Sequence, residues 1–245
     1  MSGHSKWHNI QGKKGKADKA RSNIFTKVAR LIMVAAREGG GNPDMNFSLR
    51  IAVDKAKAVN MPKDNIERAI KSGTGDAKDG KVIEEVIYEG FGPSGVAFLV
   101  EALTDNKNRT VSEVKNMFFR FGGSMGSAGT VKWMFVRLGV IRLDESQKSK
   151  VQKSIKSDFE LALIEAGAED IIDSEFGLEI RCPVEKFQIV LEVVKKNGLE
   201  PESPGLEWIA KEPVALDEAT SEKVSHLYDA FDEMDDVREV YTNEC

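Results

Sequence analysis

The spacing of apolar residues changes near residue 80, and this change divides the chain into an all-helical part and a part that alternates strands with helices. Before it, apolar side chains recur every three to four residues, which is the spacing of an amphipathic helix. A first helix is predicted from about residue 18 until Gly39–Gly41 ends it. Asn42 and Pro43 predict the cap and first turn of a second helix, and Pro62 the start of a third. The pattern therefore predicts a small three-helix domain.

After residue 80 a run rich in strand-forming residues, 82–88, is followed by a Gly90–Gly95 turn and a second apolar run, 96–103, which together predict a hairpin. Thr110 and Glu113 match a capping box, which predicts a helix over about 111–121. A glycine-rich loop, 122–129, follows, and then strand-like runs at 131–135 and 139–143.

Residues 139–205 predict the order strand, helix, strand, strand, helix, strand, which is that of a ferredoxin-like unit. The helices are expected at about 149–166 and 184–197, and the last strand near Leu199. The flanking elements make a second α/β unit that this one interrupts. The predicted fold class is α+β: a three-helix domain followed by two ferredoxin-like α/β domains, the third inserted into the second. The expected domains are 1–78, then 79–136 with 206–245, and the insert 137–205.

Charge follows the same division. Residues 1–76 hold 15 Lys and Arg against 7 Asp and Glu, a net charge of +8, whereas residues 77–245 hold 20 against 33, a net charge of −13. A locally positive surface attracts polyanions even when the whole chain is acidic, so nucleic acid is the expected partner. No apolar stretch is long enough to cross a bilayer, and no secretion signal is evident, so we expect a cytoplasmic protein without a membrane partner. Nothing in the sequence indicates an oligomeric state.

The basic part supplies most of the candidate nucleic-acid contacts. Its first 17 residues place lysines among glycines around one tryptophan, as expected of an arm whose lysines contact phosphates while the ring stacks on a base. The alternative is a solvated tail whose lysines serve solubility. The first helix adds a basic face. The predicted contacts are Lys6, Trp7, Lys13, Lys14, Lys16, Lys19, Arg21, Lys27, Arg30 and Arg37.

Two further candidate sites, of two residues each, lie beyond the basic part. Lys107 and Arg109 stand at a strand-to-helix junction, where basic side chains and a helix amino terminus both favour an anion. In the loop 122–129, Ser124 and Met125 are predicted to form a mobile interaction surface. The loop lacks the G-K-[ST] ending of a nucleotide-binding P-loop.

The sequence contains no recognisable catalytic constellation: we find no nucleophile elbow, zinc-protease helix or dinucleotide fingerprint. His4 and His8 lack a third metal ligand nearby, and the two cysteines form no C-x-x-C pair. We therefore expect no catalytic residue, no metal and no cofactor.

Several spaced blocks resemble the YebC/PmpR family: Gly3–Trp7, Ala35–Gly41, Asn60–Ile70, Tyr88–Pro93 and Asp105–Thr110, with Glu165–Asp170 continuing the likeness. The resemblance covers essentially the whole chain and implies a cytosolic bacterial protein of three domains. Phe47 and Ser48 depart from it, since many relatives are expected to have proline and arginine there.

The resemblance implies a DNA-binding transcriptional regulator, or alternatively a ribosome-associated translation factor that binds ribosomal RNA. The helical domain offers no evident base-reading helix, which weakens the first hypothesis, whereas RNA recognition by shape requires none. A third hypothesis is an enzyme that acts on phosphate-containing substrates, but this sequence contains no catalytic constellation to support it.

Overall fold

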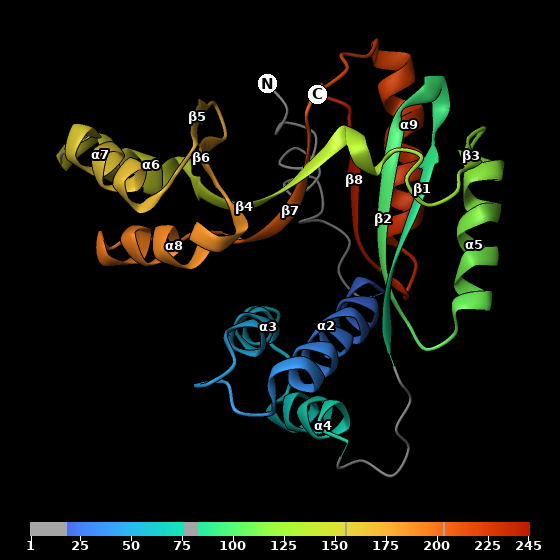
Figure 1. Cartoon of the computed structure of the whole chain (residues 1–245), viewed down its shortest axis with the longest axis horizontal. Coiled ribbons are helices and arrows are strands. Elements are labelled where there is room, and N and C mark those ends of the chain that lie inside the picture. Colours follow the sequence, from blue (N-terminus) through green and yellow to red (C-terminus); the bar gives the residue numbers. More distant parts are fainter. Residues whose placement is uncertain (1–18, 76–82, 155, 203) are drawn as a thin grey trace. The chain divides into compact units, whose positions relative to one another are not determined.

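The computed structural model describes residues 19–75, 83–154, 156–202 and 204–245. Contacts between backbone segments divide these residues into two compact units. One unit comprises residues 133–214, and the other comprises residues up to 132 together with 215–244. Each unit is built around its own four-stranded antiparallel sheet, and three helices precede the first sheet (Figure 1). The α+β class predicted from the sequence is confirmed.

The three amino-terminal helices are α2 (Lys19–Gly39), α3 (Phe47–Ala58) and α4 (Lys63–Gly73). They share one core, in which Ile32, Leu49 and Ala56 are completely buried. Helix α4 crosses α2 closely at Gly73, where a Cβ atom would lie 2.4 Å from the Met33 carbonyl oxygen. The glycine is therefore required by the approach of the two helices.

Helix α3 begins four residues later than predicted, so the assignment of Asn42 and Pro43 to its start is wrong. Asn42 instead forms a turn, and Asn46 is the cap. The side-chain oxygen of Asn46 accepts a hydrogen bond from the Leu49 amide at 3.0 Å, while its amide nitrogen donates to the carbonyls of Ala35 and Gly40. These bonds to the preceding helix give Asn46 an advantage that Asn42 lacks.

The first sheet has the strand order β3-β1-β2-β8, all antiparallel. A short 3₁₀ turn, Pro93–Gly95, joins β1 to β2, so the predicted hairpin is confirmed. Two helices, α5 and α9, pack against this sheet. The elements are β1 (Glu84–Phe91), β2 (Ala97–Thr104), α5 (Lys107–Arg120), β3 (Ser124–Met125), α9 (Glu218–Asp232) and β8 (Val237–Thr242).

Three phenylalanines from the sheet and both helices meet in the core of this domain. The ring of Phe118 on α5 lies 4.8 Å from that of Phe231 on α9 and 6.0 Å from that of Phe98 on β2, in edge-to-face contacts. All three side chains are fully buried. Aromatic contacts of this geometry stabilise beyond simple burial, so this cluster fixes both helices on the sheet.

Helix α5 begins at Lys107, and the predicted capping box of Thr110 and Glu113 is wrong. Asn106 caps the helix, because its side-chain oxygen accepts a hydrogen bond from the Arg109 amide at 3.1 Å. Thr110 lies inside the helix, and its hydroxyl is buried against Thr104. The predicted junction residues therefore form the first helical turn.

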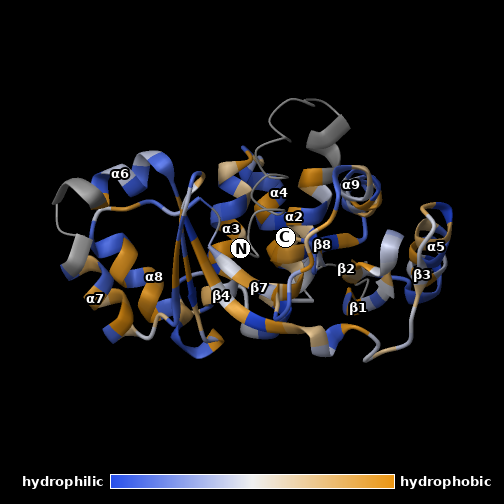
Figure 2. Cartoon of the chain, turned by 90° about the horizontal axis from the view of Figure 1, so that it is seen from above, coloured by the Kyte–Doolittle hydropathy of each residue, from blue (hydrophilic) through white to orange (hydrophobic). Residues whose placement is uncertain are grey.

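The second sheet has the strand order β5-β6-β4-β7, which with its two helical crossovers is that of a ferredoxin-like unit. Figure 2 shows hydrophobic residues, in orange, on its strands and on helix α8. The elements are β4 (Phe135–Asp144), α6 (Glu145–Ser154), α7 (Lys156–Ala166), β5 (Asp170–Ser174), β6 (Gly177–Cys182), α8 (Phe187–Lys196) and β7 (Gly205–Ala210), with 3₁₀ turns at Lys132–Met134 and Val184–Lys186.

Several predicted bounds differ in this unit. The helix expected over 149–166 corresponds to α6, which begins four residues earlier at Glu145, and to α7; residue 155 between them lies outside the described residues. A 3₁₀ turn with the start of β4 replaces the strand expected at 131–135. The strand expected near Leu199 is absent from the described chain; the fourth strand is β7, which pairs with β4. Residues 206–210 thus belong to this sheet, although they were expected in the surrounding domain.

Buried charges hold the middle of the second sheet. Arg142 on β4 donates from Nε to Glu179 of β6 at 2.7 Å, and from both terminal nitrogens to Glu207 of β7 at 2.7 and 3.0 Å. The exposed fraction of each of these residues is 6% or less. Removing one partner would leave an uncompensated buried charge, so the network fixes which strands flank β4.

Substitution of two neighbouring phenylalanines tests which of them belongs to the core of the first sheet. Replacement of fully buried Phe118 by alanine should lower the free energy of unfolding by about 3–5 kcal/mol, because it removes the ring and leaves a cavity. The same change at Phe119, which is 80% exposed, should have little effect. Urea denaturation of both variants measures the difference, and equal losses would contradict the assignment of the core.

Candidate nucleic-acid interface

The predicted contacts divide into those outside and those inside the described structure. The arm residues Lys6, Trp7, Lys13, Lys14 and Lys16 lie outside the described residues. Lys19 and Arg21 belong to the first turns of α2, and their side chains are not described. The other predicted cations have defined surroundings within the unit that contains the first sheet.

Lys27 and Arg30 lie on one face of α2; Lys27 contacts the last residue of α9, and Arg30 contacts the segment between α9 and β8. The Lys27 ammonium donates to the carbonyl oxygen of Asp232 and lies 3.5 Å from its carboxylate. Arg30 donates to the carboxylate of Asp236 at 2.7 Å and to the carbonyl oxygen of Asp235 at 2.5 Å. These basic side chains therefore attach α2 to the acidic domain.

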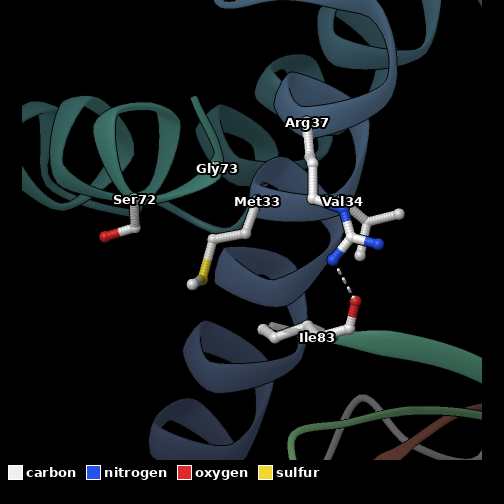
Figure 3. A pocket seen from close by; sticks show the side chains of 6 residues that line it. All are labelled: Met33, Val34, Arg37, Ser72, Gly73 and Ile83. Atoms are coloured by element: carbon white, nitrogen blue, oxygen red, sulfur yellow. Dashed lines mark hydrogen bonds between the residues drawn. The ribbon is translucent and has the colours of Figure 1, made fainter. Parts of the chain in front are cut away.

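Arg37 makes a third attachment further along the same helix. It donates to the carbonyl oxygen of Ile83, just before β1, at 3.0 Å. Figure 3 shows this bond at the edge of a small pocket, beside the crossing of α2 and α4. The pocket thus marks the joint between the helices and the first sheet. Its lining residues are Met33, Val34, Arg37, Ser72, Gly73 and Ile83.

The carboxylate of Asp236 is the centre of the joint. One oxygen accepts hydrogen bonds from the hydroxyls of Thr104 and Thr110, at 3.1 and 2.6 Å, and from Arg109 at 2.7 Å. The other oxygen pairs with Arg30. Only 4% of the residue is exposed. A single buried charge therefore links β2, α5 and α2.

The surroundings of Asp236 favour its ionised form. Burial raises the pKa of its carboxyl group, but the hydrogen bonds from Arg109 and Thr110 and the charge of Arg30 outweigh burial and leave the pKa below its ordinary value. The group is therefore charged at neutral pH and attracts the basic side chains around it.

Lys107 and Arg109 lie in the first turn of α5, and both pair with carboxylates of the protein. Lys107 lies 2.6 Å from Glu84, in an ion pair whose side chains are about half exposed. Arg109 bridges Asp105 at 3.0 Å and Asp236 at 2.7 Å. In the described structure, the anion beside this helical turn is therefore a carboxylate of the protein itself, that of Asp236.

Glu89 of β1 anchors the glycine-rich loop at its middle and at its carboxyl end. Its backbone carbonyl accepts from the Gly126 amide, and its carboxylate accepts from the amides of Gly129, Val131 and Lys132 at 2.7–2.8 Å. Burial raises the pKa of Glu89, but these three backbone hydrogen bonds outweigh it and the net pKa is lowered. A buried carboxylate therefore defines the path of the loop.

Ser124 and Met125 form strand β3, which pairs with β1. Ser124 is exposed, whereas Met125 is partly buried and packs against the aromatic core of the domain. Of the two residues predicted to form an interaction surface, Ser124 therefore lies on the surface, whereas Met125 lies against the core.

Sequence reasoning missed four exposed cations. Arg68 and Lys71 on α4, and Lys115 and Arg120 on α5, make no ion pair with any residue in the described ranges. The composition of α5 could have revealed its two cations, because this helix has four basic residues and one acidic residue within an acidic domain.

The described part of the chain lacks two kinds of feature. No cluster of three or more His, Cys, Asp or Glu side chains could hold a metal ion. No helix has both the length and the apolar character that crossing a membrane requires.

Comparison with protein families gives two adjoining matches. Residues 5–76 match the family model described as the TACO1/YebC protein N-terminal domain. Residues 83–244 match the one described as the TACO1/YebC second and third domain. The boundary between the matches coincides with the end of the three helices.

Individual relatives are similar along nearly their whole length. Probable transcriptional regulatory proteins of Persephonella marina and Fusobacterium nucleatum are 49% and 46% identical to this chain, over 99% of it and 95% of each relative. The crystal structure of a conserved hypothetical protein from Aquifex aeolicus matches with a TM-score of 0.82 at 41% identity, over 95% of this chain and 93% of that one.

Replacement of Asp236 by asparagine should lower the free energy of unfolding by about 3 kcal/mol at neutral pH, because it removes a buried charge from four partners. Since the folded pKa is lowered, the ionised group stabilises the protein above the ordinary aspartate pKa of about 3.9 and loses this effect as the pH falls through the lowered value. The difference between the native protein and the variant should therefore shrink in acid.

Urea denaturation across that pH range measures the effect of Asp236. Asp235→Asn is the matched control, since only the backbone carbonyl of exposed Asp235 contacts Arg30. A cost for Asp236→Asn that equals the control, or that persists unchanged in acid, would refute the central position of this carboxylate.

Replacement of Glu89 by glutamine should loosen the loop, because the amide nitrogen of glutamine accepts no hydrogen bond. Hydrogen exchange at Gly129, Val131 or Lys132 should accelerate at least tenfold, since a hydrogen bond to a charged group contributes about 1.5–3 kcal/mol. Glu85→Gln, on the same strand but in a surface ion pair with Arg238, should leave these amides unchanged. Equal exchange in both variants would count against the anchor.

Proposed function

This chain belongs to the TACO1/YebC family, as the resemblance in its sequence predicted, and on that premise we propose that it is a non-enzymatic, cytoplasmic regulator of transcription that binds DNA. The observation that carries the proposal is the segregation of charge: +8 in residues 1–76 against −13 in the remainder. A polyanion is attracted to the first part and repelled by the second. The names of the relatives given above agree with this role.

We assign the phosphate contacts to the arm and the first turns of α2. Lys27, Arg30 and Arg37 are engaged with Asp232, Asp236 and the Ile83 carbonyl, so they position α2 on the acidic domain. Their engagement leaves contact with the nucleic-acid backbone to the cations that precede them, with Trp7 available for stacking. The residues are Lys6, Lys13, Lys14, Lys16, Lys19 and Arg21.

A second candidate function is translation control through ribosomal RNA. The attachment of α2 favours it, since a helix held to the first sheet by three contacts is not free to enter a major groove as a reading helix. Structured RNA is recognised largely by shape and backbone, which an arm of lysines achieves without such a helix.

Replacement of Lys13, Lys14, Lys16, Lys19 and Arg21 by glutamine should weaken binding to duplex DNA and flatten its dependence on salt. Each lost phosphate contact lowers the slope of log K against log salt by about 0.9, through counterion release. Fluorescence anisotropy over a salt series measures both quantities. Lys195→Gln with Lys196→Gln, two exposed lysines of α8, is the control. An unchanged slope in the arm variant would refute the assignment.

Crosslinking in cells, followed by sequencing of the attached nucleic acid, separates the two candidates. Discrete promoter fragments that survive RNase treatment are expected for the transcriptional regulator. Recovery of ribosomal RNA without promoter enrichment would replace it with the translational role.

A further inference from the structure

Helix α5 combines three features on its outer surface that its structural role does not require. Its inner face is occupied by Thr110, Val114 and Phe118, all fully buried. Its outer face exposes Phe119, whose exposed fraction is 80%, together with Lys115 and Asn116. Because residues three and four positions apart are neighbours on a helix, the Phe119 ring lies beside both of these side chains.

The positive charge of this face has no ion-pair partner among the described residues. The helix carries four basic residues and one acidic residue, in a part of the chain where acidic residues outnumber basic ones. Lys107 and Arg109 are paired with carboxylates, whereas Lys115 and Arg120 have no ion-pair partner among the residues described. The two cations flank Phe119 in the sequence.

A single exposed apolar side chain is ordinary on a protein surface, and Leu161 and Ile189 are other examples here. Phe119 differs because it is a flat ring bordered by unpaired cations and a side-chain amide. Exposed aromatic rings stack on unpaired bases, neighbouring cations contact the phosphates between them, and an amide bonds to base edges. Bases within a duplex are already stacked, so a ring on a helix surface has little access to them.

We propose that the outer face of α5, formed by Lys115, Asn116, Phe119 and Arg120, binds single-stranded nucleic acid, with Phe119 stacked on a base and the two cations on phosphates. The inference rests on the proposed function and adds to it a second contact surface, on the acidic domain and separate from the basic arm. It gives the protein a means to prefer an unpaired segment, whether of RNA or of opened DNA, over a continuous duplex.

The test uses the full-length protein and short labelled oligonucleotides of mixed sequence: single-stranded DNA, single-stranded RNA and the corresponding DNA duplex. Phe119→Ala should weaken binding to the single strands roughly tenfold and leave duplex binding nearly unchanged. Phe119→Trp should retain single-strand binding, because it keeps an aromatic ring. Lys115→Ala with Arg120→Ala should reduce the salt slope for single strands by about 1.4, for two phosphate contacts.

A matched control is available on α8, where Ile189, Lys195 and Lys196 are an exposed apolar residue and two exposed, unpaired cations of the described chain. Alanine at these three positions should leave binding unchanged. Circular dichroism verifies that every variant is folded, as expected for surface positions.

The outcomes separate the two proposals. Single-strand binding that is unchanged by the α5 variants, or equally reduced by the α8 control, overturns the present inference while the proposed function stands. A native protein that binds neither single strands nor duplex overturns both. Where the α5 variants weaken single-strand binding as expected, a greater affinity of the native protein for RNA than for DNA single strands identifies RNA as the source of the unpaired segment.

Discussion

The carboxylate of Asp236 is the interaction on which the first sheet and its helices depend. It lies between β2, α5 and α2, and it accepts from two hydroxyls and two guanidinium groups while almost completely buried. A buried charge is tolerated only when its partners surround it. The positions of Thr104, Thr110, Arg109 and Arg30 are therefore mutually dependent, and the amino-terminal helices are joined to the sheet through the same group that fixes the start of α5.

The contacts around Asp236 give the division of charge a second, structural role. Part of the positive charge of the amino-terminal region is directed inward, where Lys27 and Arg30 meet Asp232 and Asp236. The opposite charges of the two regions thus hold domains together as well as attracting a polyanion. Cations in the same helix can have different tasks, and only their partners in the fold distinguish those tasks.

Local signals in the sequence predicted most elements, and they failed where distant contacts decide between similar residues. Gly39–Gly41 predicted the carboxyl end of α2, and two runs around a glycine-containing turn predicted the hairpin. Asn42 and Asn46 are equally good caps locally, but only Asn46 reaches the carbonyls of Ala35 and Gly40. The strand expected near Leu199 is replaced by β7 at Gly205–Ala210, because pairing with β4 determines where the last strand lies.

The same limit applies to the candidate interface. The partners of Lys27 and Arg30 lie 205 residues away along the chain, so no pattern near α2 reveals that these cations are engaged. The unpaired cations of α5 were visible in composition, yet their freedom depends on the absence of acidic neighbours in space. Sequence identified which region is basic, and the fold determines which of its charges face outward.

The chain enters and leaves the inserted unit through two neighbouring strands, because Phe135 at the start of β4 pairs with Ala210 at the end of β7. The two points where the surrounding domain is interrupted are therefore held together by the insert's own hydrogen bonds. For the surrounding sheet, roughly eighty residues behave as a short, already closed loop, because a folded insert with adjacent ends adds little closure entropy. The topology consequently permits the insert to change in length and sequence over evolution without disturbing the pairing of β8 with β2.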